Sequence, residues 1–304
     1  MPEAPNPMIF NDRQRLNTIY VVAGLIVCRC LPLHAEDAPS APLFPSTLTL
    51  QLLGDNGGQR DLYLALDLSL PRDLRLQLEG GVLRGGANPD DTCSMRVGFG
   101  TDPAGDFSTT GYYFNRNQSG AFVIHGAGAE LVVYHRDWML SLIPEFRTIT
   151  LYTTELVHRR RAVEKVELNS QGVEFGVAYF GLSDWGLSLY HRFDDYSEDL
   201  NRLARYPRLA ELLFSQGALN LAWGLDSSRT RFTATRYLAS SPVALGLSVS
   251  NSHSAVVGSD YLSATLNLDW EFDPHWALST SLGSADGGGG YRNAYLSMAL
   301  LYQW

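Results

Sequence analysis

The last fourteen residues, Tyr291 to Trp304, read YRNAYLSMALLYQW and decide the fold class of this chain. Every second residue here is large and apolar or aromatic, namely Leu296, Met298, Leu300, Tyr302 and Trp304. A period of two is that of a β-strand, in which successive side chains point to opposite faces. The sequence therefore predicts a C-terminal strand with one apolar face that ends on an aromatic ring.

Such a strand resembles the closing strand of Gram-negative outer-membrane β-barrels. The resemblance concerns the architectural class and identifies no narrower family. It implies that the five alternating residues form an assembly signal, which the membrane's barrel-assembly machinery reads during biogenesis. It also implies that every earlier segment either pairs into the same barrel or connects its strands.

The composition agrees with a barrel rather than a helical membrane protein. The chain has 304 residues, of which 45% are hydrophobic, so a large apolar surface can be built. No run of eighteen apolar residues is present for a spanning helix, which excludes a helical membrane protein. The formal net charge of -9 argues against a nucleic-acid partner, because nucleic acids select basic surfaces.

The N-terminal segment has the features of an export signal. Within residues 1–35, Arg13 precedes the apolar run Ile19 to Val27, and Ala35 offers a small residue at the cleavage point. Residues 36–45, which contain three prolines, predict an extended linker. Export and an outer-membrane location follow from this interpretation.

Residues 46–304 are predicted to form the barrel. Leucine alternates with other residues over 48–52, 62–70 and 74–78. Strands of soluble sandwiches are about five or six residues long, with leucine diluted by other apolar types. Membrane barrels need about 9 to 11 residues per strand, apolar toward lipid and polar or small toward the lumen. The longer leucine-rich alternation therefore favours membrane-spanning strands.

The number of strands needs both the patterning and the constraint of closure. Patterning along the chain gives fifteen strands, one of them at Leu219 to Leu225, but a bacterial barrel with both ends in the periplasm needs an even number. The side of the membrane assigned to each turn differs when it is counted forward along the chain and backward from Trp304. The two assignments conflict between about residues 194 and 260, so one strand there is misread. We predict an all-β, transmembrane, antiparallel up-and-down β-barrel of about 14 strands, within a range of 12 to 16.

One short helical insert is predicted at about residues 195–215. Asp199 lies in a capping sequence, and the following Leu209, Leu212 and Phe214 help to form an apolar face with helical spacing. Two interpretations stay open. The insert is either a self-packed surface loop or a loop that folds into the pore mouth and constricts it.

Two charged runs are expected in extracellular connections. The basic run is His158 to Arg161, and the acidic run is Asp194-Asp195 with Glu198-Asp199. The basic run could contact lipopolysaccharide phosphates, and the acidic one could hold divalent cations. Solvated loops are often charged, so neither run specifies a ligand by itself.

The polar residues that alternate with the leucines are predicted to line the lumen. They are mixed in sign, and the candidates are Tyr63, Asp67, Arg75, Gln77, Glu79, Asn267 and Asp269. With about 14 strands the barrel is wide enough that such side chains need not fill it. A water-filled or loop-constricted channel is thus expected.

Three functions remain open at this point. The leading one is a porin-like channel for small polar solutes. The alternatives are the barrel of an export or cell-surface assembly system and an outer-membrane lipid-modifying enzyme. No nucleophile signature accompanies any histidine, so the sequence predicts no catalytic, metal or cofactor-binding residue and no cofactor. The expected partners are outer-membrane lipid and lipopolysaccharide.

Overall fold

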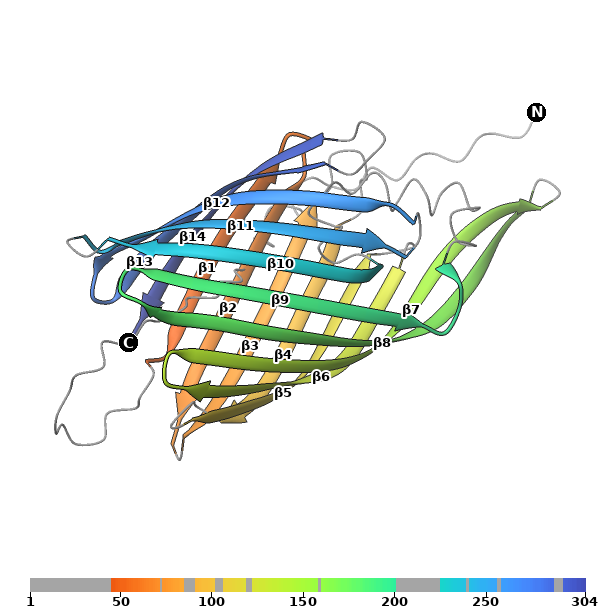
Figure 1. Ribbon diagram of the computed structural model, residues 1–304. Helices are drawn as coiled ribbons and strands as arrows, with labels where there is room; N and C mark the ends of the chain where they lie inside the picture. Colours follow the sequence, from red (N-terminus) through yellow and green to blue (C-terminus); the bar gives the residue numbers. More distant parts are fainter. Residues whose placement is uncertain are drawn as a thin grey trace.

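The computed structural model describes residues 45–71, 73–84, 91–101, 106–118, 122–157, 160–200, 225–238, 241–255, 258–286 and 292–304. The described chain forms a closed barrel in which each strand pairs antiparallel with the next and the first pairs with the last (Figure 1). The predicted fold class and the number of 14 strands are confirmed. Among the described residues, no helix is long and apolar enough to cross a membrane.

The strands follow the chain in order around the barrel. They are β1 (Thr47–Asp55), β2 (Arg60–Leu70), β3 (Leu74–Arg84), β4 (Thr92–Thr101), β5 (Phe107–Gln118), β6 (Phe122–His135), β7 (Trp138–Val157), β8 (Arg160–Leu182), β9 (Trp185–Tyr196), β10 (Asp226–Tyr237), β11 (Val243–Ser254), β12 (Asp260–Asp273), β13 (Trp276–Asp286) and β14 (Arg292–Gln303).

The pairing of β9 with β10 corrects the fifteen-strand pattern. These two strands are hydrogen-bonded directly, from Ser228 opposite Phe193 to Arg236 opposite Trp185. No further strand can therefore enter the wall between them. Leu225 lies just before β10 and in no strand, whereas residues 219–224 are outside the described residues.

The proposed start of the helical insert is also corrected. Asp195 and Tyr196 belong to β9, where they lie opposite Gln171 and Ser170 of β8. The strand continues past the predicted boundary because its backbone is still paired with a neighbour. The remainder of the predicted insert, from residue 201 onward, lies outside the described residues.

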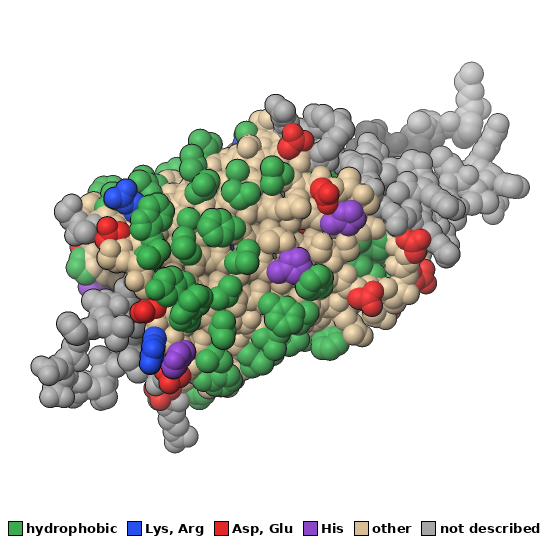
Figure 2. Space-filling view, in the orientation of Figure 1, with side chains coloured by type: hydrophobic (Ala, Val, Ile, Leu, Met, Phe, Trp, Pro, Cys, Tyr) green, Lys and Arg blue, Asp and Glu red, His purple; other side chains and the backbone are tan. Residues whose placement is uncertain are grey.

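The outer face of the wall carries exposed large hydrophobic side chains. Leu52, Leu64, Leu266 and Leu282 expose 55, 41, 60 and 59% of their surface, respectively. Figure 2 shows hydrophobic side chains spread over this face between the two ends of the barrel. Soluble proteins rarely expose a continuous apolar area of this kind. The outer face is therefore suited to lipid.

The closing seam joins β1 to β14 over the whole length of β1. The register runs from Thr47 opposite Gln303 to Asp55 opposite Tyr295. Beyond it, the backbone amides of Ser46 and Trp304 each donate to the other residue's carbonyl at 3.1 Å. Both ends of the barrel chain thus lie at the same rim.

Aromatic side chains gather on the outer face near that rim. The Tyr302 ring lies 4.7 Å from Trp276 and stacks on Trp304 at 5.7 Å. Further round the barrel, Trp138 and Tyr179 lie 4.6 Å apart. Such rings with a polar edge suit the interface between lipid and water. The predicted assembly signal therefore includes two residues of this belt, while its role in biogenesis stays a prediction.

One hairpin is much longer than the others. β7 has 20 residues and β8 has 23, and they pair along their length from Trp138 opposite Tyr179 to Val157 opposite Arg160. This hairpin projects well beyond the rim that lies opposite Ser46 and Trp304 (Figure 1). The predicted basic run at 158–161 includes its tip, although the side chains of 153–164 are not described.

Replacing Leu64 with Arg tests the lipid-facing assignment. An Arg near the bilayer midplane should cost about 2 to 4 kcal/mol of barrel stability. Ala65→Arg is the matched control, because residue 65 points inward and lies opposite Glu79 of β3. The heat-modifiable, folded fraction in membranes should fall for Leu64→Arg and be largely retained for Ala65→Arg. Equal folding of the two variants would contradict the assignment.

Deleting Tyr302 to Trp304 should lower the amount of inserted barrel. The deletion removes the reciprocal Ser46–Trp304 bonds at the seam and the aromatic contact with Trp276. The measurement is the yield of heat-modifiable protein in the membrane fraction, compared with a deletion in the proline-rich segment 36–45. Normal insertion of the truncated chain would show that the terminal aromatics are dispensable.

Candidate functional site

The inward face of β2 and β3 carries five of the predicted lumen residues. They alternate with the lipid-facing leucines, so their side chains project from the opposite face of the wall. Asp67 lies opposite Gln77, and Ser69 opposite Arg75. The Arg75 Nε donates to Asp67 Oδ1 at 2.6 Å, and Gln77 Nε2 reaches Asp67 Oδ2 at 3.5 Å. The structure thus brings three of these residues into one polar group.

Tyr63 and Glu79 form a second group further along the same two strands. The Tyr63 hydroxyl donates to Glu79 Oε2, and Arg96 of β4 donates from Nη1 to Glu79 Oε1 at 3.0 Å. The Arg96 guanidinium also lies 4.1 Å from the centre of the Tyr112 ring of β5. One polar chain therefore crosses four neighbouring strands, and Arg96 is its central member.

Asn267 and Asp269 lie on a different wall. They are on β12, which is separated from β2 by β13, β14 and β1. Asp269 accepts a hydrogen bond from the hydroxyl of Ser279, and Asn267 lies opposite Gly246 and Ser281. The structure does not join them to the groups on β2 and β3.

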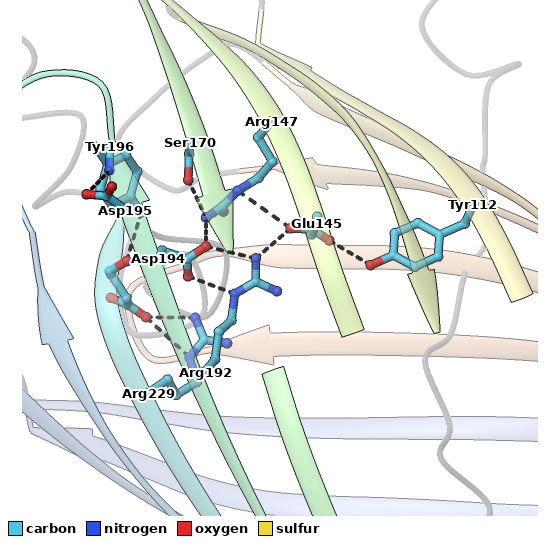
Figure 3. Close-up of polar contacts among 10 residues, drawn as sticks. Tyr112, Glu145, Arg147, Ser170, Arg192, Asp194, Asp195, Tyr196 and Arg229 are labelled. Carbon is cyan, nitrogen blue, oxygen red and sulfur yellow. Dashed lines mark hydrogen bonds and ion pairs between the residues drawn. The ribbon is translucent and has the colours of Figure 1, made fainter. Parts of the chain in front are cut away.

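The densest charged cluster was not among the predicted site residues. It consists of Glu145 and Arg147 of β7 with Arg192 and Asp194 of β9, and it lies on the inward face of the wall (Figure 3). β8 separates the two strands, so these long side chains meet across it. We call these four residues the charged cluster.

Glu145 is held by three partners. The Tyr112 hydroxyl donates to its Oε2 at 2.9 Å, and Arg192 Nη2 donates to its Oε1 at 2.6 Å. Arg147 Nε lies 3.5 Å from the same Oε1. Through Tyr112, the charged cluster is linked to Arg96 and hence to the Tyr63–Glu79 group.

Asp194 binds both arginines. Its Oδ2 accepts from Arg192 Nε at 2.7 Å and its Oδ1 accepts from Arg192 Nη2 at 3.0 Å. The same Oδ1 accepts from Arg147 Nη2, which also donates to Ser170 Oγ at 3.2 Å. The two hydrogen bonds from Arg192 to Asp194 fix the plane of the Arg192 guanidinium as well as its position.

The backbone of β8 makes room for the charged cluster at Gly172. A Cβ at this position would collide with the Asp194 carboxylate and would lie 2.8 Å from Arg192 Nη2. Any side chain larger than hydrogen would therefore displace the ion pairs. Glycine weakens most strands, so its presence in mid-strand here follows from the close approach.

The predicted acidic loop run is corrected by this arrangement. Asp194 and Asp195 are strand residues of β9, and the Asp194 side chain is only 4% exposed. The available signal was the period of two: Glu145 and Arg147 alternate on one strand, as do Arg192 and Asp194 on the other. Sequence reasoning missed it because charges near a strand end resemble loop charges.

A cavity of about 360 Å³ lies inside the barrel against these groups. Its lining includes Tyr63, Glu79 and Arg96 from one side and Glu145, Arg192 and Asp194 from the other. The cavity thus combines carboxylates and guanidinium groups along one continuous wall. Its size is within the usual range for binding sites of small molecules.

An apolar cluster lies on the inward face toward the rim opposite the termini. Its buried members are Phe122, Ile149, Leu151, Leu168, Leu200 and Leu225. Leu200 and Leu225 flank residues 201–224 and are 2 and 7% exposed. Both described ends of that segment are therefore packed against the wall. Of the predicted constriction residues, Asp199 is exposed, whereas Leu209, Leu212 and Phe214 lie outside the described residues, so the constriction stays a prediction.

Comparison with known proteins found matches among solved structures. No protein-family model and no curated protein matches the sequence. Among solved structures, the barrel is similar to OmpT of Vibrio cholerae, with a TM-score of 0.48, 10% identity, and coverage of 88% of this chain and 100% of that one. OprB of Pseudomonas putida gives a TM-score of 0.47, 9% identity, and coverage of 86 and 94%.

A KdgM porin solved with disordered oligogalacturonate is also similar. Its TM-score is 0.43 and its identity 8%, over 85% of this chain and 99% of that one. Identities this low carry no site residue from one protein to another. The class resemblance predicted from the C-terminal strand is confirmed by the closed antiparallel barrel with its apolar outer face: this chain has the fold of an outer-membrane β-barrel protein.

Replacing Asp194 with Ala should destabilise the barrel. The change leaves Arg147 and Arg192, which are 9 and 16% exposed, without one of their carboxylates. Breaking a buried pair in this way costs on the order of 3 to 5 kcal/mol. The measurement is the free energy of unfolding in urea.

Lys165→Ala is the control for this change, because it breaks an ion pair with Glu167 that is exposed on both sides. Exposed pairs contribute little, so this variant should unfold as the unchanged protein does. If both variants lost the same stability, the charged cluster would not be a buried network.

Proposed function

We propose that this protein is an outer-membrane channel that passes small polar solutes. The observation that carries the proposal is the cavity inside the closed barrel, whose wall is charged while the outer face is apolar. A barrel built to be filled would present apolar or tightly packed side chains inward over its whole length. Polar groups toward the lumen and apolar groups toward lipid are instead what an aqueous passage needs.

The two sides of the interior differ in a way that supports passage. The inward positions of β11 to β13 carry small hydroxyl side chains, which bond to one another. Examples are Ser250 with Ser263 at 2.8 Å and, from β10 to β11, Thr233 with Ser248 at 2.9 Å. Short side chains leave space in front of them. The passage would therefore run between these short side chains and the charged side chains on the inward face of β2 to β9.

The chemistry of the charged wall suits solutes that carry hydrogen-bonding groups. Carboxylates and guanidinium groups alternate there, and most are already paired with each other. A paired group keeps its position, because moving it away would leave the charge of its partner without a counter-charge. Solutes would therefore meet a fixed pattern of donors and acceptors rather than mobile charges.

Conductance in planar lipid bilayers tests the proposal. Folded protein, verified by heat modifiability, should produce discrete current steps in salt solution. Protein that has been heat-unfolded before addition is the control and should produce none. A folded, inserted barrel that gives no current steps would refute the channel.

Arg96→Ala should raise the single-channel conductance. Arg96 reaches from β4 across Glu79 and the Tyr112 ring into the cavity lining, so its removal should widen the passage. Val97→Ala is the matched control, because Val97 is the adjacent residue on the lipid-facing side and is 42% exposed. An unchanged conductance in Arg96→Ala would mean that the passage does not run past this residue.

A further inference from the structure

A second hollow lies on the outside of the barrel, near the rim opposite the termini. It has a volume of about 700 Å³ and is formed by β1, β2, β3 and β14. The lining is mainly apolar, and Arg60 and Arg84 are its two basic members. We call this hollow the rim groove. Eight of its ten lining residues occupy lipid-facing positions, and the other two are Leu53 and Asp61.

The strand register explains how the rim groove forms. One row across the wall reads Leu296, Gly54, Arg60 and Arg84, each opposite the next on its neighbouring strand. Gly54 occupies a lipid-facing position but has no side chain, which leaves a notch between Leu296 and Arg60. The next row toward the membrane centre is entirely apolar and consists of Met298, Leu52, Leu62 and Val82.

The two arginines concentrate positive charge at the notch. Arg60 lies directly opposite Arg84, and like charges in that position repel and destabilise a sheet. Arg84 Nε is paired with Asp91 at 3.1 Å, but both side chains of this pair are well exposed, at 63 and 40%. Within the described part of the chain, Arg60 has no hydrogen-bond or ion-pair partner. Asp61 belongs to the inward face, where Arg116 is its basic neighbour.

The position of the rim groove indicates which lipids it would meet. Barrels of this class have short turns on the periplasmic side and longer connections outside. The tight turns at 136–137, 183–184 and 274–275 lie at the rim that holds Ser46 and Trp304. The rim groove is at the other rim, and thus at the level of the outer leaflet, where the lipids are phosphorylated glycolipids with several acyl chains.

We propose that the rim groove binds one phosphorylated glycolipid of the lipid A type. A phosphate lies between Arg60 and Arg84, where guanidinium groups can contact its oxygens at two points each. An acyl chain enters at the notch of Gly54 and follows Leu52, Leu62 and Val82 toward the membrane centre. The anion also relieves the repulsion between the two arginines. The proposal rests on the outer-membrane location and not on channel activity.

The test measures lipid retention by the folded barrel in detergent with native mass spectrometry. The probes are diphosphorylated lipid A, the same lipid without phosphates, and phosphatidylglycerol. The unchanged protein should retain diphosphorylated lipid A most strongly. The double variant Arg60→Gln with Arg84→Gln should bind it about tenfold or more weakly and should lose the preference for phosphate. Arg236→Gln is the control, because Arg236 is an exposed arginine near the other rim, beside Trp185.

A second variant tests the contribution of the notch to lipid binding separately from that of the two arginines. Gly54→Leu fills the notch without changing charge, and a Cβ at this position meets its nearest atom, the carbonyl oxygen of Gln59, at an ordinary 3.8 Å. It should weaken retention of lipid A with and without phosphates. Heat modifiability verifies that each variant is folded, and conductance should be the same in all of them. Equal retention by the double variant, or equal retention of phosphatidylglycerol and lipid A by the unchanged protein, would overturn the proposal.

Discussion

The constraint on which this structure depends is the satisfaction of every backbone polar group along the membrane-facing wall. Hydrocarbon offers no hydrogen-bond partner, so a sheet that spans it must have no open edge. The pairing of β1 with β14 removes the last open edge. The reciprocal hydrogen bonds between Ser46 and Trp304 continue this pairing by one more residue pair. Because β1 and β14 pair antiparallel, their outer ends meet at one rim and the number of strands is even.

Closure also decides what each side chain faces. Over the membrane-spanning part of the wall, alternate residues of a closed sheet point either to lipid or to the interior. The outer face is therefore apolar, as at Leu266 and Leu282, and the charged residues of mid-strand gather inside. A charge that is buried inside loses its hydration, which costs free energy unless the charge is paired. The ion pairs among Glu145, Arg147 and Asp194 offset this cost.

The interior and the exterior of the wall thus offer two distinct recognition surfaces. The interior has a fixed polar wall facing short hydroxyl side chains, which is suited to solutes in water. The exterior has an apolar cover that is hollowed where Gly54 leaves a notch beside Arg60 and Arg84. Glycine is decisive on both faces: at Gly172 it admits the charged cluster, and at Gly54 it opens the groove.

The sequence by itself determined the fold class, the lipid-facing positions and the approximate strand number, because a period of two is a local property of each strand. The inward orientation of residues such as Asp67 and Glu79 followed from the same pattern. Only the tertiary structure decided which inward charges meet. Arg192 and Glu145 are 47 residues apart and touch because β8 holds β7 and β9 at a particular register and leaves space at Gly172. Register between distant strands is set by the closure of the whole barrel, so no single stretch of sequence displays it.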